Sequence, residues 1–369
     1  MILRDPIHPQ FFKGQGLRLV LLAVMVSAFI FGFADLVSNR NFERLHIFLF
    51  NLCSGGFVIL YHTENTARPS PRTFGFLALS LLYAIFAFLQ IYLPAAVLSL
   101  ILAVLVESIR LQKFSFLPLD LFSTRTPVVD KFHHAAILCL SISLVIAAFV
   151  VVNNDILHWI ANKNMTLNLF FLGYSFPLSL MAMSVMFSFI PEGPAKVHRI
   201  LIQVFFWFIT LGVVAFFLFI LFDFPLAKFL IATALFMVVA GMLIFFLRYG
   251  RAVQQKHFLA SGMFFLLGTG VSGVAYIVLA RFPEAYQDYG RLLLNTHGYL
   301  ALYGWSLSGM LVLIRWNDFP LRVNSLGAIS LHWIALGLFA PLGKTSLTMA
   351  LIAILLYLLF LGHFFQRDR

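Results

Sequence analysis

The sequence predicts an all-α, polytopic membrane protein with about 12 transmembrane helices. Of the 369 residues, 62% are hydrophobic and only 11% are charged, whereas soluble domains are about 45–50% apolar and about 25% charged. No soluble core could bury this much apolar surface, so lipid must be the solvent. The apolar residues also form long segments, and none shows the alternating polarity of β-barrel strands.

Twelve segments are long enough to cross a bilayer, which takes about 20 apolar residues in a helix. In chain order the predicted spans are Leu17–Val37, Leu45–Tyr61, Phe74–Tyr92, Pro94–Leu111, Phe132–Val152, Leu167–Ile190, His198–Phe222, Pro225–Leu247, His257–Leu279, Arg291–Ile314, Leu326–Pro341 and Thr345–Phe365. The third and fourth meet at Leu93 and Pro94, so they form either a tight hairpin or a re-entrant pair. No soluble domain interrupts the array, and we expect one transmembrane domain over residues 1–369.

The basic residues predict an orientation. With the N-terminus in the cytoplasm, 18 of the 25 Lys and Arg residues fall on the cytoplasmic side and 7 on the opposite side. Cytoplasmic loops carry an excess of Lys and Arg, so both termini are expected in the cytoplasm and the protein in a cytoplasmic (inner) membrane. The net charge of +11 then reflects topology. The basic residues are scattered over short loops, which argues against a nucleic-acid partner.

Two residue classes exclude or disfavour some functions. Cys53 and Cys139 lie in apolar segments and form no Cys-x-x-Cys pair, which excludes iron–sulfur and zinc sites of that type. Acidic residues are nearly absent from the centres of the predicted spans, and Asp35 and Glu107 lie near span ends. Ion-coupled transporters usually carry an ionisable group deep in the bundle, so this scarcity argues against ion coupling.

Eleven histidines suggest a different chemistry, because imidazole is a common ligand of haem iron. The predicted topology places His46 at the outer start of the second span and His297 about two turns into the tenth, at a shared depth. From each histidine, successive steps of 3 and 4 residues, which add to 7, follow one face of the helix. They reach small residues, among them Gly56 and Gly304. Such a stripe leaves room for a flat macrocycle beside the helix, but it equally permits close packing of two helices.

Three further residues near His297 could contact a haem. Arg291, at the outer start of the tenth span, could pair with a propionate, and Tyr299 and Tyr303 could hydrogen-bond one. Each has an ordinary alternative. Arg291 could be an interfacial anchor, and each tyrosine could be a packing side chain with one bonded hydroxyl.

A second haem site on the cytoplasmic side would use His134 and His332. His332 is embedded in an apolar run, whereas His134 follows His133 at a span start. Adjacent residues point about 100° apart on a helix, so only one of this pair is expected to face the bundle core.

These features resemble subunit I of the haem-copper oxidases, in which helices two and ten hold the low-spin haem. The run from Asn295 to Trp305, followed by Ser308-Gly309-Met310, looks like the histidine-then-glycine helix of its smaller relatives. It is also similar to the NnrS family of haem-containing membrane proteins linked to nitric oxide stress. Arg44-Leu45-His46, followed by Phe50 and Gly55-Gly56, looks like their span-two motif. The resemblance covers the layout of the whole chain through short motifs, and it implies a haem b with His46 and His297 as axial ligands.

The chain departs from the oxidase pattern where a copper site would lie. The oxidases carry a His-x-His pair in span ten, but the positions two away from His297 are Asn295 and Tyr299. The sixth span has no histidine, and the loop after the seventh reads Asp223-Phe224-Pro225. No copper is therefore expected, and the resemblance implies electron transfer or handling of NO or O2 rather than oxygen reduction.

Two other functions stay open. The first is a 12-helix transporter or permease without a cofactor, although residues 1–185 and 186–369 show no convincing internal repeat. The second is a membrane anchor subunit of a redox complex, with a quinone site or a redox partner protein. In every case membrane lipid is the surrounding partner, and whether the protein is an enzyme is left undecided.

Overall fold

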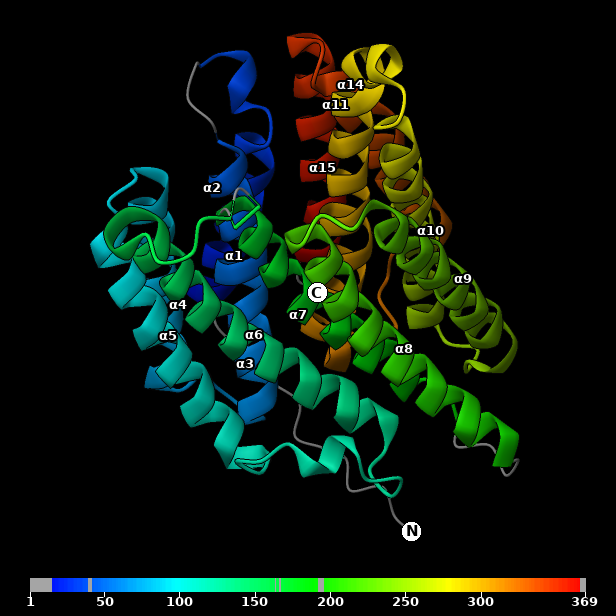
Figure 1. The fold of residues 1–369 in the computed structure, drawn as a ribbon. Coiled ribbons are helices and arrows are strands. Elements are labelled where there is room, and N and C mark those ends of the chain that lie inside the picture. Colours follow the sequence, from blue (N-terminus) through cyan, green and yellow to red (C-terminus); the bar gives the residue numbers. More distant parts are fainter. Residues whose placement is uncertain (1–14, 39–41, 163, 166, 192–195, 366–369) are drawn as a thin grey trace.

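The computed structural model describes residues 15–38, 42–162, 164–165, 167–191 and 196–365. Within these ranges every regular element is a helix, as predicted (Figure 1). Eleven helical stretches are long and apolar enough to cross a membrane, and α7 (Leu167–Ser188) occupies the position of the sixth predicted span. The prediction of a multi-pass helical membrane protein is confirmed at this level.

The remaining helices follow the predicted order. They are α1 (Gln15–Phe31), α2 (Glu43–Ile47), η2 (Phe48–Gly56), α3 (Phe57–Glu64), α4 (Pro71–Phe88), α5 (Tyr92–Lys113), η3 (Leu119–Leu121), α6 (Val128–Val152), η4 (Asn153–Leu157), α8 (Lys196–Leu221), α9 (Pro225–Tyr249), α10 (Gln254–Leu279), α11 (Pro283–Tyr299), η5 (Leu300–Ser306), α12 (Leu307–Ile314), α13 (Ser325–Trp333), η7 (Ile334–Phe339), α14 (Ala340–Gly343) and α15 (Leu347–Phe365), with short 3₁₀ turns η1 (Ala34–Leu36) and η6 (Trp316–Asp318).

The third and fourth spans form a tight hairpin of two separate helices. Ser70 caps α4 by accepting hydrogen bonds from the backbone N–H groups of Arg72 and Thr73. The chain then reverses at Gln90, which adopts a left-handed φ of 60°. With 18 and 22 residues, α4 and α5 are about 27 and 33 Å long, so each is long enough to cross the bilayer.

The second and tenth spans lie at the centre of the bundle. In each of them, 83% of the most apolar stretch is buried, against 22–56% in the other candidate spans. Both are distorted in the middle: η2 joins α2 to α3, η5 joins α11 to α12, and both η segments are π-helical. Because π turns are rare and are frequent at functional sites, these two helices are the natural place to look for one.

The tenth span begins earlier than predicted. The helical stretch runs over Pro283–Ile314 and has 32 residues, whereas the hydropathy pattern placed its start at Arg291. Pro283 occupies the first turn of α11, where the missing N–H of proline costs nothing. The apolar pattern marked only the more apolar part of a longer helix.

The loop between α5 and α6 has an apolar outer face. Phe116, Leu119 and Phe122 are 67–74% exposed, whereas Leu121 between them is buried. The loop lies at the end of the bundle where α5 ends and α6 begins (Figure 1). An apolar outer face of this kind is suited to contact with a membrane surface.

Candidate functional site

His46 lies against the tenth span but not against His297. Its Nδ1 is 3.2 Å from the hydroxyl of Tyr303 in η5, and the two rings lie nearly parallel with centroids 6.2 Å apart. A Cβ added at Gly32, which follows α1, would lie 3.7 Å from the same nitrogen. The central cluster around His46 is therefore built from α2, α1 and η5.

His297 points toward α10. Its Nδ1–H donates to the carbonyl oxygen of Thr269 at 3.0 Å, and its ring packs on Gly273, where an added Cβ would lie 3.1 Å from it. Tyr299, about 200° further around the helix, donates instead to the carbonyl oxygen of Gly32 at 3.1 Å. His297 and Tyr299 thus face opposite sides, and the described contacts give His46 and His297 separate partners.

The two glycines expected to leave a slot are packed against phenylalanines. A Cβ added at Gly56 would lie 2.8 Å from the ring of Phe76, and one added at Gly304 would lie 2.5 Å from the ring of Phe265. Both distances are shorter than any ordinary carbon–carbon contact. The small residues therefore allow neighbouring helices to approach closely, which is the packing alternative considered for the stripe.

The residues proposed to contact propionates also have ordinary surroundings. Arg291 lies within α11 and is exposed. Tyr299 and Tyr303 are buried, and the hydroxyl of each is bonded within the protein. As arranged, the described residues around His46 and His297 do not fit a haem held between these two ligands.

His134 and His332 do not form a joint site. His332 is buried in α13, where its Nε2–H donates to the carbonyl oxygen of Tyr303 at 2.8 Å. Its ring also stacks on Phe360 with centroids 4.1 Å apart. His134 lies at the start of α6, and its partners come from α5 and the loop that follows it.

Where α5 ends and α6 begins, His134 is the middle member of a hydrogen-bonded series of three ionisable groups. Arg110 donates from Nη1 to Nε2 of His134 at 2.9 Å. Nδ1 of His134 lies 2.7 Å from Oδ2 of Asp120. A guanidinium is only a donor, so Nε2 must carry the lone pair and Nδ1–H must donate to the carboxylate. His134 is therefore neutral, with its tautomer set by its two partners.

Arg110 ties this series to the loop. Its guanidinium pairs with Glu107 one turn earlier at 2.8 Å, and it donates to the carbonyl oxygens of Ser115 and Phe116. The ring of Phe114 stacks on His134 with centroids 4.4 Å apart. Because the Arg110 side chain is 2% exposed, this is a buried charge with its donors satisfied, as burial requires.

His133 belongs to a second, adjoining series. Thr63 donates its hydroxyl hydrogen to the carbonyl of Ile59, so its oxygen accepts from Nε2–H of His133 at 2.8 Å. Nδ1 of His133 then accepts from Lys113 at 3.3 Å. His133 and His134 are 3% and 0% exposed. The expectation that only one of them faces the core was therefore wrong, because α3 covers one histidine and α5 with its loop covers the other.

One atom of this ionisable cluster has no partner. Oδ1 of Asp120 is buried and accepts no hydrogen bond among the described residues, while the side chain as a whole is 26% exposed. The formal charges of Glu107, Arg110, Lys113 and Asp120 sum to zero, with both histidines neutral. A further hydrogen-bond donor could therefore approach Oδ1 of Asp120 without displacing an existing partner.

Sequence reasoning missed Asp120 because the residue lies in a loop. The sequence did contain one indication of its role. Asp120 is an acidic residue in an otherwise apolar segment, three residues after Leu117, and this segment connects the basic end of α5 to the His133-His134 pair. For metal binding, the described residues contain no group of three or more His, Cys, Asp or Glu side chains. Single imidazoles such as that of His297 are the available ligands.

Comparison with known proteins gives no relative. No family model matches the chain, no curated protein matches it, and no solved structure matches it. Arguments about function therefore rest on the residues and their geometry.

Proposed function

We propose that this chain is a proton-linked membrane transport protein and that Asp120, supported by His134, is its proton-binding site. The observation that carries the proposal is the buried, unpartnered Oδ1 of Asp120 beside a neutral histidine whose two nitrogens are both engaged. Ionisable groups buried in a membrane protein are costly, and they commonly mark ion pathways and proton relays.

Proton binding would weaken the contact between the α5–α6 loop and the helix bundle. With Asp120 ionised, the bond from His134 is charge-assisted and therefore about twice as strong as a neutral one. A proton on Oδ1 neutralises the carboxylate and weakens that bond, while Arg110 continues to hold Glu107 and His134. Protonation would then loosen η3 from α6 and leave α5 in place, which provides a two-state element for coupling.

Acidic residues are scarce near the span centres, but buried ionisable groups also occur near the helix ends. Arg110 and Lys131 are 2% and 1% exposed there. Arg110 is covered by the loop, whose Ser115 and Phe116 carbonyl groups it bonds. Lys131 is instead covered by α8 through Gln203, Phe206 and Trp207. We also propose that this end faces the cytoplasm and that the termini do the same, on the strength of the Lys and Arg distribution.

The test uses the full-length protein in vesicles with an internal pH-sensitive dye and an imposed membrane potential. Wild-type protein should admit protons faster than protein-free vesicles do, and Asp120→Asn should lower this rate at least tenfold. Asparagine keeps an acceptor for Nδ1–H of His134 but cannot take the proton. Asp223→Asn, in an exposed ion pair with Lys228, is the matched control and should retain the wild-type rate. Wild-type vesicles as proton-tight as protein-free ones would contradict transport.

Haem binding is the second proposal, and one observation favours it. Histidines that bind metals usually donate their other ring N–H to a carbonyl or carboxylate, and His297 donates Nδ1–H to Thr269, which leaves the Nε2 lone pair available. We rank haem binding below proton transport because Gly56 and Gly304 pack closely against phenylalanine rings. An absorption spectrum of protein purified after growth with ample haem tests this proposal: a Soret band that is lost in His297→Ala supports it, and the absence of a band rejects it.

A further inference from the structure

A long groove lies between α8 and the facing ends of α6 and α7. It has a volume of about 1220 Å³, which exceeds the range of about 300–1,000 Å³ that is usual for small-molecule sites. The exposed side chains of Val204, Phe208 and Leu211 border it. Since these residues belong to a membrane-crossing helix, the groove opens sideways, toward lipid.

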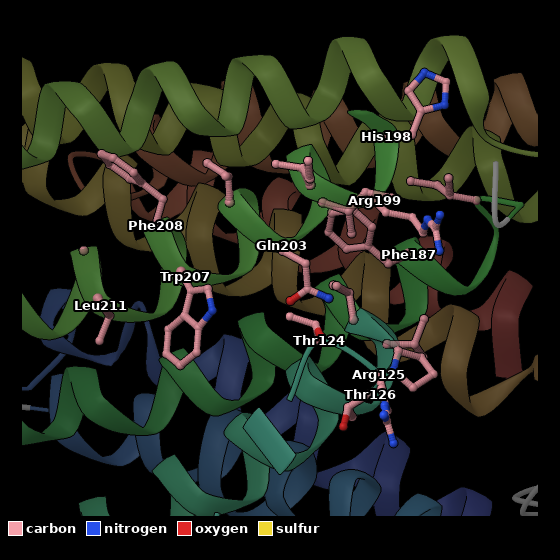
Figure 2. A pocket seen from close by; sticks show the side chains of 18 of the residues that line it. Thr124, Arg125, Thr126, Phe187, His198, Arg199, Gln203, Trp207, Phe208 and Leu211 are labelled. Carbon is pink, nitrogen blue, oxygen red and sulfur yellow. The ribbon is translucent and has the colours of Figure 1, made fainter. Parts of the chain in front are cut away.

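The groove is polar at one end and apolar at the other (Figure 2). Arg125, Arg199 and Gln203 lie at or near the polar end, and Trp207, Phe208 and Leu211 continue the wall away from it. His198 also borders the groove, but its ring packs on Tyr249 of α9 with centroids 4.4 Å apart. From Arg199 to Ala215, α8 rises about 24 Å. The groove therefore extends from the membrane surface well into a hydrocarbon core of about 30 Å.

A buried cation lies behind the polar end. Lys131 is 1% exposed, and its ammonium donates to Oε1 of Gln203 at 2.7 Å. It also lies 5.7 and 6.0 Å from the ring centroids of Phe206 and Trp207. An amide and two aromatic faces do not neutralise a buried charge. Asp120 acts on Lys131 through its charge, but its Oδ2 is bonded to His134.

We propose that this groove binds an anionic phospholipid. Its phosphate would lie at the polar end beside Gln203, where Lys131 supplies charge from behind and the exposed Arg125 and Arg199 supply it from the rim. An acyl chain would lie along Trp207, Leu211 and Ala215. A zwitterionic lipid has the same chains but no net charge to offset Lys131, so the anionic headgroup is preferred. This site does not depend on proton transport.

Native mass spectrometry of the full-length protein, released from mixed phosphatidylglycerol and phosphatidylcholine, provides the test. The wild type should retain phosphatidylglycerol at least tenfold over phosphatidylcholine. Lys131→Met, which keeps the length and apolar packing of the side chain, should lose this preference. Lys228→Met removes a basic residue from an exposed ion pair on α9 and should leave the preference unchanged. Equal retention of both lipids by the wild type, or an unaltered preference in Lys131→Met, overturns the proposal.

Three further measurements serve as controls. Ala215→Trp fills the apolar end without changing charge, so it should reduce retention of both lipids; unchanged retention overturns the acyl-chain placement. Inorganic phosphate is added as a competitor. Phosphatidylglycerol retention unaffected by phosphate supports the lipid assignment, whereas full displacement by phosphate would mean a phosphate site and would overturn it. Thermal unfolding in detergent should show Lys131→Met folded, because Lys131 forms no ion pair among the described residues and methionine keeps its contacts with Phe206 and Trp207.

Discussion

Nη1 of Arg110 lies 2.9 Å from Nε2 of His134, and this single contact determines the protonation of the ionisable cluster. The guanidinium cannot accept a hydrogen bond, so the imidazole must present a lone pair to it. A second proton on His134 would place two donors in opposition across 2.9 Å. The next proton to enter the cluster must therefore go to a carboxylate, and Oδ1 of Asp120 accepts no hydrogen bond among the described residues.

His134→Ala should destabilise the protein by on the order of 3 kcal/mol, because it removes a hydrogen-bond partner from the buried Arg110 and from Asp120 at once. His198→Ala on α8 is the control, since its histidine packs on Tyr249 outside the cluster. Thermal unfolding in detergent measures both. If His134→Ala lost no more stability than His198→Ala, the cluster would not support the fold as described.

Tyr303→Phe and Tyr357→Phe should differ in their free energies of unfolding, although both tyrosines are buried and their ring centroids lie 5.7 Å apart. The hydroxyl of Tyr303 is bonded to His46, so its removal should cost about 1 kcal/mol. The hydroxyl of Tyr357 is buried and has no hydrogen-bond partner among the described residues, so its removal should be neutral or stabilising. Unfolding free energies in detergent compare the pair, and equal losses would contradict the assigned hydrogen bond.

Gly304→Ala and Gly298→Ala test the close approach of α10 to the tenth span. The new methyl at Gly304 would meet Phe265 at 2.5 Å, and such overpacking costs about 1–3 kcal/mol. Nothing lies within 4 Å of a Cβ at Gly298, so alanine should be neutral or gain up to about 1 kcal/mol from helix propensity. Two equally tolerated alanines would mean that the space beside Gly304 is open, as a haem slot requires.

The spans could be predicted from the sequence because their signal is local. Length and hydropathy within one segment suffice for a helix in lipid, and each of the twelve predicted segments overlaps a helix or a continuous helical stretch. The start of the tenth span was not predictable in this way. Tyr286, Asp288 and Arg291 lower the hydropathy of α11 without interrupting the helix that Pro283 begins.

The candidate site was harder to predict because side-chain direction is not a local property. Depth along a helix can be counted from the sequence, and it placed His46 and His297 at one level. Their directions depend on which neighbours pack against them, here Tyr303 and Thr269. Asp120 was missed for the same reason, since only the folded loop brings it to His134.

The central claim is that Asp120 binds the transported proton, and a titration of purified full-length protein by infrared difference spectroscopy tests it most directly. The account predicts a protonated-carboxyl band that appears as the pH falls, is absent in Asp120→Asn and persists in Asp223→Asn. His134→Gln should shift this band, because the hydrogen bond from Nδ1 is changed. A titration identical in wild type and Asp120→Asn would contradict the claim.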